Sequence, residues 1–125
     1  MAAVVLDAGV VIGLLNADDA HHKRAISRLR ELADRPLLMA MSTYSEILVG
    51  MINEHREEVV EGLLERAPIE LVPISRSIAR GAAALRAAHG ALRLPDALSL
   101  ATALERGAEL ITFDKRLRRI ATEHP

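Results

Sequence analysis

Four short runs of apolar residues are spaced along the chain, and longer segments with helical periodicity separate them. Short runs rich in Val, Leu and Ile are typical of strands that are buried on both faces. The predicted strands are residues 3–6, 37–41, 69–72 and 109–112. Strands that alternate with helices in this way predict a parallel sheet with helices covering its faces.

Seven segments between and after these runs have apolar residues at helical spacing. In residues 20–33, Ala25, Leu29 and Leu32 fall on one stripe. Another segment starts near Pro95 and stops before Gly107, the usual asymmetry of helix ends. The predicted helices are residues 9–15, 20–33, 42–52, 54–65, 76–88, 95–106 and 114–121. The expected element order is therefore β-α-α-β-α-α-β-α-α-β-α.

Length and composition limit the possible chemistry. The chain has 125 residues, which fits one domain with its own hydrophobic core. It has no cysteine, so disulfides, thiolate zinc sites and cysteine nucleophiles are excluded. Any metal must then be held by carboxylates or histidines. No apolar run approaches the length of a membrane span, so a cytoplasmic protein without a membrane partner is expected.

Charge gives a local signal rather than a global one. The formal net charge is −1, which does not by itself indicate a nucleic-acid partner. A basic cluster nevertheless stands near the end of the chain, at Lys115, Arg116, Arg118 and Arg119. These residues fit a solvated helix end as well as a surface that contacts phosphate, and the sequence leaves both interpretations open.

Four acidic residues fall near strand ends or in the first helical turns beyond them. Asp7 follows the first predicted strand, and Glu46 lies about one turn into the helix after the second. Asp96 starts the helix before the fourth strand, and Asp114 follows that strand. Since functional groups collect at the carboxyl ends of parallel strands, one edge of the sheet could gather all four.

Carboxylates that crowd together repel each other unless a cation neutralises them. Oxygen ligands suit hard ions such as Mg²⁺ and Mn²⁺, which can activate water and stabilise charge on a phosphoryl group. Two ions about 3.5–4 Å apart would clamp the attacking and leaving oxygens together. Thr112 could support such a site by hydrogen-bonding a ligand carboxylate or a metal-bound water.

Each acid also has a simpler interpretation as a helix-start residue. Asp7 and Asp114 are favoured N-cap residues. Thr43 and Glu46 stand at the spacing of a capping box, and Asp96 begins a helix beside a proline. These interpretations explain each residue singly, but not why all four stand near strand ends.

Other polar clusters carry weaker signals. Asp18 and Asp19 precede the adjacent His21 and His22, a pattern typical of a capped helix start, with a contact from His21 to substrate as the alternative. The remaining histidines are scattered and are expected to be structural; they are His55, His89 and His124. The chain has neither a Gly-rich phosphate loop nor a Gly-x-Ser-x-Gly elbow.

Four segments together resemble the motifs of PIN domains, particularly the VapC toxins of type II toxin–antitoxin systems. Residues 5–12 read VLDAGVVI and residues 42–46 read STYSE. Residues 94–103 read LPDALSLATA, and residues 110–117 read LITFDKRL. The resemblance runs from about residue 3 to residue 117, with the motifs in the family's order.

The resemblance implies a single domain over residues 1–125, built as a three-layer α/β/α sandwich around a parallel sheet of four to five strands. It implies Mg²⁺- or Mn²⁺-dependent hydrolysis of RNA, with Asp7, Glu46, Asp96 and Asp114 as metal-site acids and Thr112 beside them. Asp7 and Asp96 would contact the metal most directly. It also implies a cognate antitoxin and a homodimer. Residues 119–125 leave little room for the short final strand of many relatives.

Two other classes of protein remain as alternatives. A phosphoacceptor receiver domain needs an Asp after its third strand, where this chain reads Leu71-Val72-Pro73-Ile74. A non-catalytic PIN-like interaction module would have no use for the four acids, yet all four are present.

Overall fold

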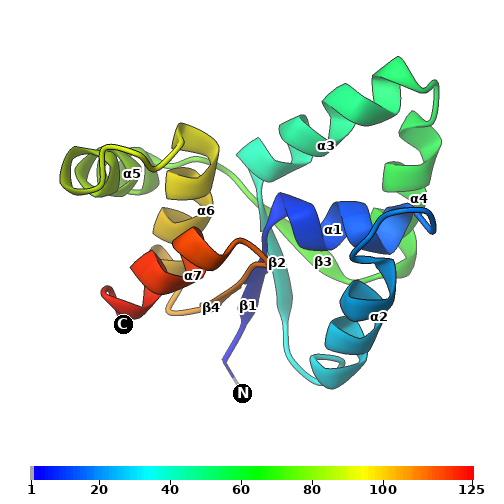
Figure 1. Cartoon of the computed structure of the whole chain (residues 1–125), viewed down its shortest axis with the longest axis horizontal. Coiled ribbons are helices and arrows are strands. Elements are labelled where there is room, and N and C mark those ends of the chain that lie inside the picture. Colours follow the sequence, from blue (N-terminus) through cyan, green and yellow to red (C-terminus); the bar gives the residue numbers. More distant parts are fainter. Residues whose placement is uncertain (1) are drawn as a thin grey trace.

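A parallel sheet of four strands lies in the middle of the molecule in the computed structural model, which describes residues 2–125 (Figure 1). Along the sheet the order is β3-β2-β1-β4, and every neighbouring pair is parallel. In register, Val4 of β1 lies opposite Leu37 of β2 on one side and Glu109 of β4 on the other. The strands are β1 (Val4–Leu6), β2 (Leu37–Ala40), β3 (Ile69–Val72) and β4 (Glu109–Ile111).

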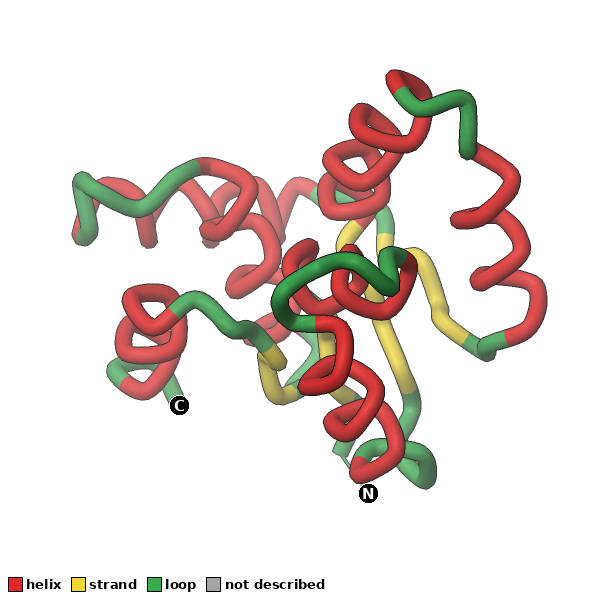
Figure 2. The backbone as a smooth tube through the Cα atoms, turned by 45° about the vertical axis from the view of Figure 1, so that its right-hand side comes forward, coloured by secondary structure: helices red, strands yellow, loops and turns green. Residues whose placement is uncertain are grey.

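Helices cover both faces of this sheet, which gives the three-layer α/β/α sandwich that the sequence predicts. One face carries α1 (Ala8–Leu15), α2 (His22–Glu31), α3 (Met41–Asn53) and α4 (Glu57–Arg66). The other carries α5 (Arg76–Ala88), α6 (Leu94–Glu105) and α7 (Lys115–Thr122). In Figure 2 the strands run between the two groups of helices. Among residues 2–125, no helix combines the length and apolarity that crossing a membrane requires.

The central strands β1 and β2 are continuous apolar runs because each one contributes side chains to two separate cores. Val5 and Leu38 pack with α5, α6 and α7. Val4, Leu6 and Met39 pack on the opposite face with α1, α3 and α4. Each fully buried Val or Leu side chain stabilises the fold by about 1.5–3 kcal/mol, so neither face tolerates a polar substitution.

Two helices, α2 and α4, begin two or three residues later than predicted because the chain turns just before them. Before α2, the Asn16 side chain accepts a hydrogen bond from the Asp18 N–H, and the Asp19 carboxylate accepts one from the His21 N–H. Such side-chain turns compete with helix. Before α4, His55 has φ 57°, in the left-handed region, which separates α3 from α4.

The sheet has four strands within residues 2–125, the lower of the two predicted numbers. The segment after β4 forms α7, in which Leu117 and Ile120 are buried against α5 and α6. Residues 119–125 therefore continue a helix and a short tail instead of adding a strand.

Candidate active site at the carboxyl end of the sheet

The carboxyl end of β1 lies at a topological switch point, where the strands that follow along the chain are placed on opposite sides of β1. From β1 the chain passes through α1 and α2 to β2 on one side, while β4 joins β1 on the other. In open parallel sheets, ligands bind at such a switch point, beyond the carboxyl ends of the strands. Asp7 directly follows β1, and its backbone N–H donates to the Ile111 carbonyl of β4 at 3.0 Å. Asp7 thus lies between the ends of β1 and β4.

The carboxylate of Asp7 is nearly buried, with 7% of the residue exposed. The Thr112 hydroxyl donates to Asp7 Oδ2 at 2.7 Å and accepts a hydrogen bond from the Asp114 backbone N–H at 3.1 Å. Thr112 therefore fixes Asp7 and the start of α7 together. Asp7 occupies the N-cap position of α1, but its side chain makes no capping hydrogen bond. Asp7 therefore stands at the start of α1, as the helix-start interpretation expects, but it provides no side-chain cap, because its carboxylate accepts the Thr112 hydroxyl just after β4.

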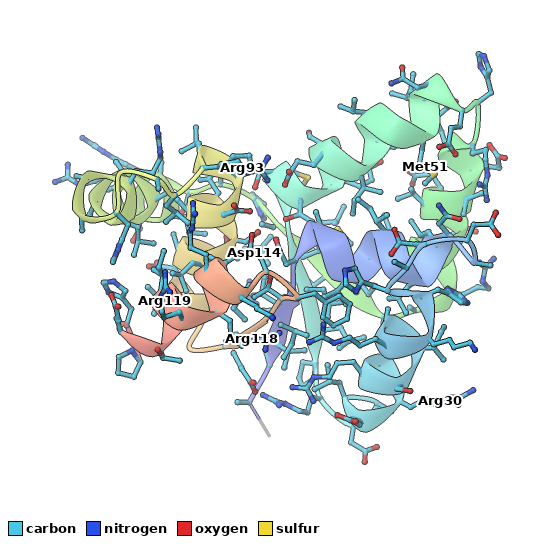
Figure 3. The ribbon with its side chains drawn as sticks, in the orientation of Figure 1. Arg30, Met51, Arg93, Asp114, Arg118 and Arg119 are labelled. Atoms are coloured by element: carbon cyan, nitrogen blue, oxygen red, sulfur yellow. The ribbon has the colours of Figure 1, made fainter. Side chains whose placement is uncertain are left out.

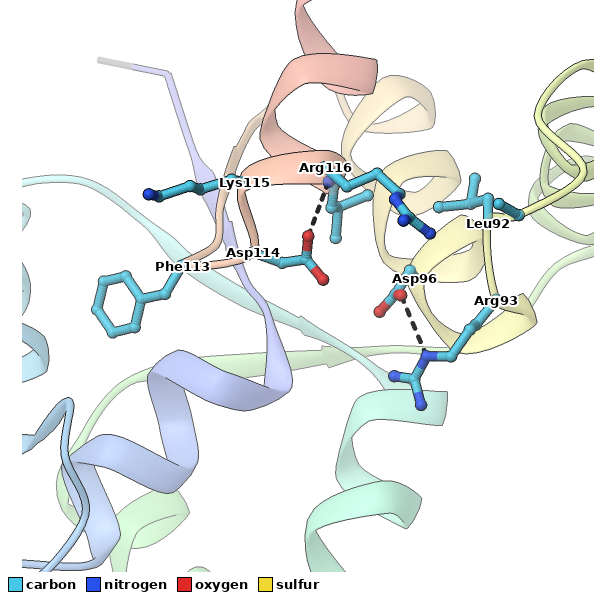
Figure 4. A pocket seen from close by; sticks show the side chains of 9 residues that line it. Leu92, Arg93, Asp96, Phe113, Asp114, Lys115 and Arg116 are labelled. Carbon is cyan, nitrogen blue, oxygen red and sulfur yellow. Dashed lines mark hydrogen bonds and ion pairs between the residues drawn. The ribbon is translucent and has the colours of Figure 1, made fainter.

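Asp96 and Asp114 face the same space as Asp7. Asp96 lies in the first turn of α6, and Asp114 is the N-cap of α7, where it accepts the Leu117 N–H at 3.0 Å. The capping interpretation is thus correct for Asp114, but it does not exclude a second role. Asp7, Asp96 and Asp114 line one cleft of about 300 Å³. Figure 4 shows Asp96 and Asp114 on facing sides of the adjoining pocket.

Glu46 approaches this group from α3. The N-cap of α3 is Ala40, which provides no side-chain cap. The predicted capping box of Thr43 and Glu46 is wrong, because Thr43 is buried and hydrogen-bonds the Ser99 hydroxyl at 3.0 Å. Glu46 is instead free to face Arg93, whose guanidinium lies 4.0 Å from Glu46 and 3.4 Å from Asp96.

Burial and like charge raise the pKa of two of these acids. The pKa of Asp7 is raised chiefly by burial, and further by the charges of Asp96 and Asp114, against the lowering effect of the Thr112 hydrogen bond. The pKa of Glu46 is raised by burial and by Asp7, while Arg93 opposes the rise. A buried carboxylate among other carboxylates is costly unless a cation neutralises it. Arg93 is the nearby cation, but its side chain is 68% exposed.

These residues fit a hard divalent ion. The donor set consists of carboxylate oxygens, with the Thr112 hydroxyl holding one of them. Across the described part of the chain, no three of the four acids bring carboxylate oxygens within 4.8 Å of one another. That spacing is too wide for an all-protein cage but suits Mg²⁺ or Mn²⁺, which keep several waters.

Three residues around the cleft were not among the site residues predicted from the sequence: Arg93, Phe113 and Arg24. Arg93 stands three positions before Asp96, and this i, i+3 spacing could have predicted the ion pair between them. Phe113 lines the cleft, and the Arg24 guanidinium lies 4.2 Å from its ring centroid. His21, which the sequence offered as a substrate contact, lines the same cleft with its ring centroid 5.2 Å from that of Phe113. Only tertiary structure brings Arg24 to Phe113, because α2 and the segment after β4 are distant in sequence.

The basic cluster of α7 divides into two parts. Lys115 and Arg116 line a pocket of about 510 Å³ that also includes Arg93 and Asp96. Arg118 donates to the Thr112 carbonyl at 3.0 Å, so it supports the strand end. Arg119 lies in the last turn of the helix, where a cation is favourable. In Figure 3, Arg93 and Asp114 lie beside the strand ends, whereas Arg30 and Met51 lie well away from them.

The chain matches one known protein family and resembles several solved structures. The model of the PIN domain family matches residues 4–123. A toxin–antitoxin complex from Klebsiella pneumoniae contains a chain that is 30% identical, with a TM-score of 0.73 and coverage of 91% of this chain and 88% of that one.

Two more distant structures share the fold. VapC20 of Mycobacterium tuberculosis, described as a toxin that cleaves the sarcin–ricin loop, is 20% identical, with a TM-score of 0.77 and 94% coverage of both chains. VapBC2 of Rickettsia felis, solved with a promoter DNA fragment, is 17% identical, with a TM-score of 0.76 and coverage of 94% and 92%. No curated protein sequence matches the chain.

Proposed function

Because this chain belongs to the PIN domain family, we propose that it is a divalent-metal-dependent ribonuclease that hydrolyses RNA phosphodiester bonds. The observation that carries the proposal is the convergence of Asp7, Asp96 and Asp114 on one cleft at the switch point of the sheet. The solved toxin that cleaves the sarcin–ricin loop has the same fold, which supports RNA as the substrate class. A receiver domain does not fit this family, so that alternative is set aside.

Asp7 and Asp96 would hold the metal most directly, and Glu46 and Asp114 partly through water. Asp7 is the most buried of the four and is oriented by Thr112. One oxygen of Asp114 accepts the Leu117 N–H, which leaves its other oxygen for the cleft. When bound, Mg²⁺ or Mn²⁺ supplies an activated water and stabilises charge on the phosphoryl group.

The chain's own cations would position the RNA backbone. Arg93, Lys115 and Arg116 line the same pocket as Asp96, so they can bind phosphate oxygens beside the acids. Charge reversal of Arg116 and Arg119 should weaken RNA binding and flatten its dependence on salt. Arg118 belongs to this surface by sequence, but its hydrogen bond to Thr112 means that its replacement would also disturb the strand end. Binding that is unchanged across salt in the reversed variants would refute the assignment.

We further propose that the protein is the toxin of a toxin–antitoxin pair, on the strength of the 30% identical chain in such a complex. An antitoxin arginine could neutralise the acids by bidentate pairing, as Arg93 does in part within this chain.

A homodimer is proposed as well, since Val49 and Ile52 of α3 are more than half exposed and offer apolar contact surface. A monomeric mass by light scattering at micromolar concentration would contradict the dimer.

The proposed activity is tested by incubating a mixed RNA pool with Mg²⁺, with Mn²⁺ or with EDTA, and comparing wild type with Asp96→Asn. Glu105→Gln is the matched control, because Glu105 lies at the other end of α6 and binds Ser77. Cleavage should require metal, persist in the control and fall at least about 10²-fold in Asp96→Asn. Folded wild type that binds metal but cleaves no RNA in the pool, including ribosomal and transfer RNA, would favour the non-catalytic PIN-like module.

A further inference from the structure

Outside the acidic cleft, two histidines and a glutamate meet where α5 ends and α7 gives way to the C-terminal tail. His89 is the C-cap of α5, and Glu123 and His124 follow α7. The Nε2 atoms of His89 and His124 are 3.2 Å apart, and His89 Nε2 lies 3.8 Å from Glu123 Oε2. Within residues 2–125 this is the one group in which three or more such side chains bring ligand atoms within 4.8 Å of one another.

The distance between the two imidazole nitrogens is close to what a single metal ion imposes. With Zn–N bonds of about 2.0–2.1 Å and a tetrahedral angle, two nitrogen ligands lie about 3.3–3.4 Å apart. The rings of His89 and His124 are nearly perpendicular, at 80°, with centroids 5.4 Å apart. Their nitrogens can therefore converge without a clash between the rings. A simple hydrogen bond between two neutral imidazoles accounts for the same contact and is the competing explanation.

Both ligand segments are held by backbone hydrogen bonds. The His89 N–H donates to the Leu85 carbonyl at 2.9 Å, and the His89 carbonyl accepts from the Leu92 N–H at 2.9 Å. The Glu123 and His124 N–H groups donate to carbonyls of the last turn of α7 at 3.0 and 3.2 Å. His124 also lines an open cleft of about 560 Å³, so solvent can reach the cluster. Little rearrangement is needed for the three side chains to share an ion.

We propose that His89, Glu123 and His124 form a second metal site, which takes a borderline transition ion such as Zn²⁺ or Ni²⁺. Two imidazoles and one carboxylate with an open fourth position suit these ions and disfavour Mg²⁺. The ion joins the end of α5 to a segment 35 residues further along the chain. Its effect is to fasten the C-terminal tail onto the layer of α5, α6 and α7, independently of the acidic cleft.

The test uses the full chain without an affinity tag. Zn²⁺ and Ni²⁺ are titrated by calorimetry into a protein carrying Asp96→Asn, so that the acidic cleft is weakened, and excess Mg²⁺ is present throughout. Three further variants each remove one ligand: His89→Gln, Glu123→Gln and His124→Ala. The control is His55→Asn, because His55 has φ 57° and Asn accepts that backbone conformation. Glu123 and His124 follow the last helix, so their replacement leaves the core intact.

One ion per chain should bind in the parent protein and in His55→Asn, and each histidine variant should lose at least about 100-fold in affinity, as removal of a direct ligand requires. Free Zn²⁺ at about 100 times its Kd should raise the parent's Tm by roughly 10 °C, and His124→Ala should abolish this rise. Co²⁺ should give a visible absorption band that the same variants lose. Equal binding in His55→Asn and His124→Ala, or no Zn²⁺ binding by the parent, would overturn the site and leave a histidine–histidine hydrogen bond.

Discussion

Replacement of Thr112 by valine removes the hydroxyl that joins Asp7 to the start of α7, with little change of shape. The hydroxyl makes two hydrogen bonds, one to the Asp7 carboxylate at 2.7 Å and one from the Asp114 N–H at 3.1 Å. A bond to a charged group contributes about 1.5–3 kcal/mol and a neutral one about 0.5–1.5 kcal/mol. We therefore expect Thr112→Val to lower the free energy of unfolding by about 2–4 kcal/mol, which is roughly 6–20 °C in Tm.

The loss of stability in Thr112→Val should depend on pH in a defined direction. The Thr112 hydrogen bond lowers the pKa of Asp7, which burial raises. Without this bond the folded-state pKa of Asp7 rises further above its unfolded value. An acid with a raised folded-state pKa favours the fold when it is protonated, and this advantage is lost as pH rises through the folded-state pKa. The difference in stability between wild type and Thr112→Val should therefore grow as pH rises and shrink in acid.

Thermal unfolding of the metal-free proteins between mildly acidic and neutral pH measures this effect, with Thr43→Val as the control. Thr43 is also buried, but its hydroxyl pairs with the neutral Ser99 hydroxyl. Thr43→Val should lower the free energy of unfolding by about 1–3 kcal/mol, with no such dependence on pH. Mn²⁺ affinity should fall about 10–100-fold in Thr112→Val alone. A Tm change below 2 °C, or the same pH profile in both variants, would refute the role given to Thr112.

Three further predictions concern the charge of Asp7, the packing of two glycines and an exposed ion pair. Asp7→Asn should abolish RNA cleavage yet raise the Tm of the metal-free protein at neutral pH. The raised pKa of Asp7 means that its ionised form destabilises the fold, and asparagine carries no charge. A lower Tm would contradict this. Gly13→Ala should destabilise the fold, since the added Cβ would lie 3.1 Å from a methyl group of α2 and 3.2 Å from a backbone carbonyl. At Gly50 an added Cβ would meet nothing within 4 Å, so Gly50→Ala should stabilise α3 by about 0.5–1 kcal/mol. Denaturant titrations of both variants measure the two effects. Arg106→Ala should leave the unfolding midpoint unchanged within error despite the bidentate contact with Glu70, because water screens this exposed pair; a clear drop in the midpoint would count against that argument.

The sequence was sufficient to predict the order of the elements and the layers of the fold. Strands buried on both faces leave an unbroken apolar run, and β1 and β2 show this pattern without ambiguity. The helix starts were less predictable, because the Asp19 carboxylate accepts the His21 N–H in a turn at residues that the periodicity assigned to a helix. A local polar contact decided the start of α2, and the left-handed backbone of His55 decided the start of α4.

At the site, the strand-end rule located the acids but could not assign their partners. The spacing of Thr43 and Glu46 matched a capping box, yet the buried contact of Thr43 with Ser99 prevents it. This contact joins α3 to α6, so no local pattern reveals it. The contact between His89 and His124 could not be predicted for the same reason, because 35 residues separate them. Interactions between distant elements were the part that only the tertiary structure supplied.

The central claim is that the acids beyond β1 and β4 hold one divalent-ion site. The most direct measurement is Mn²⁺ binding by electron paramagnetic resonance, in a background of His124→Ala that removes the proposed second site. Asp7→Asn and Asp96→Asn are compared with Glu105→Gln as the control. We expect Mn²⁺ affinity to fall about 100-fold or more in both aspartate variants and to be unchanged in the control. Because Asp7→Asn should not unfold the protein, Mn²⁺ binding equal to that of the control in this variant would contradict the account.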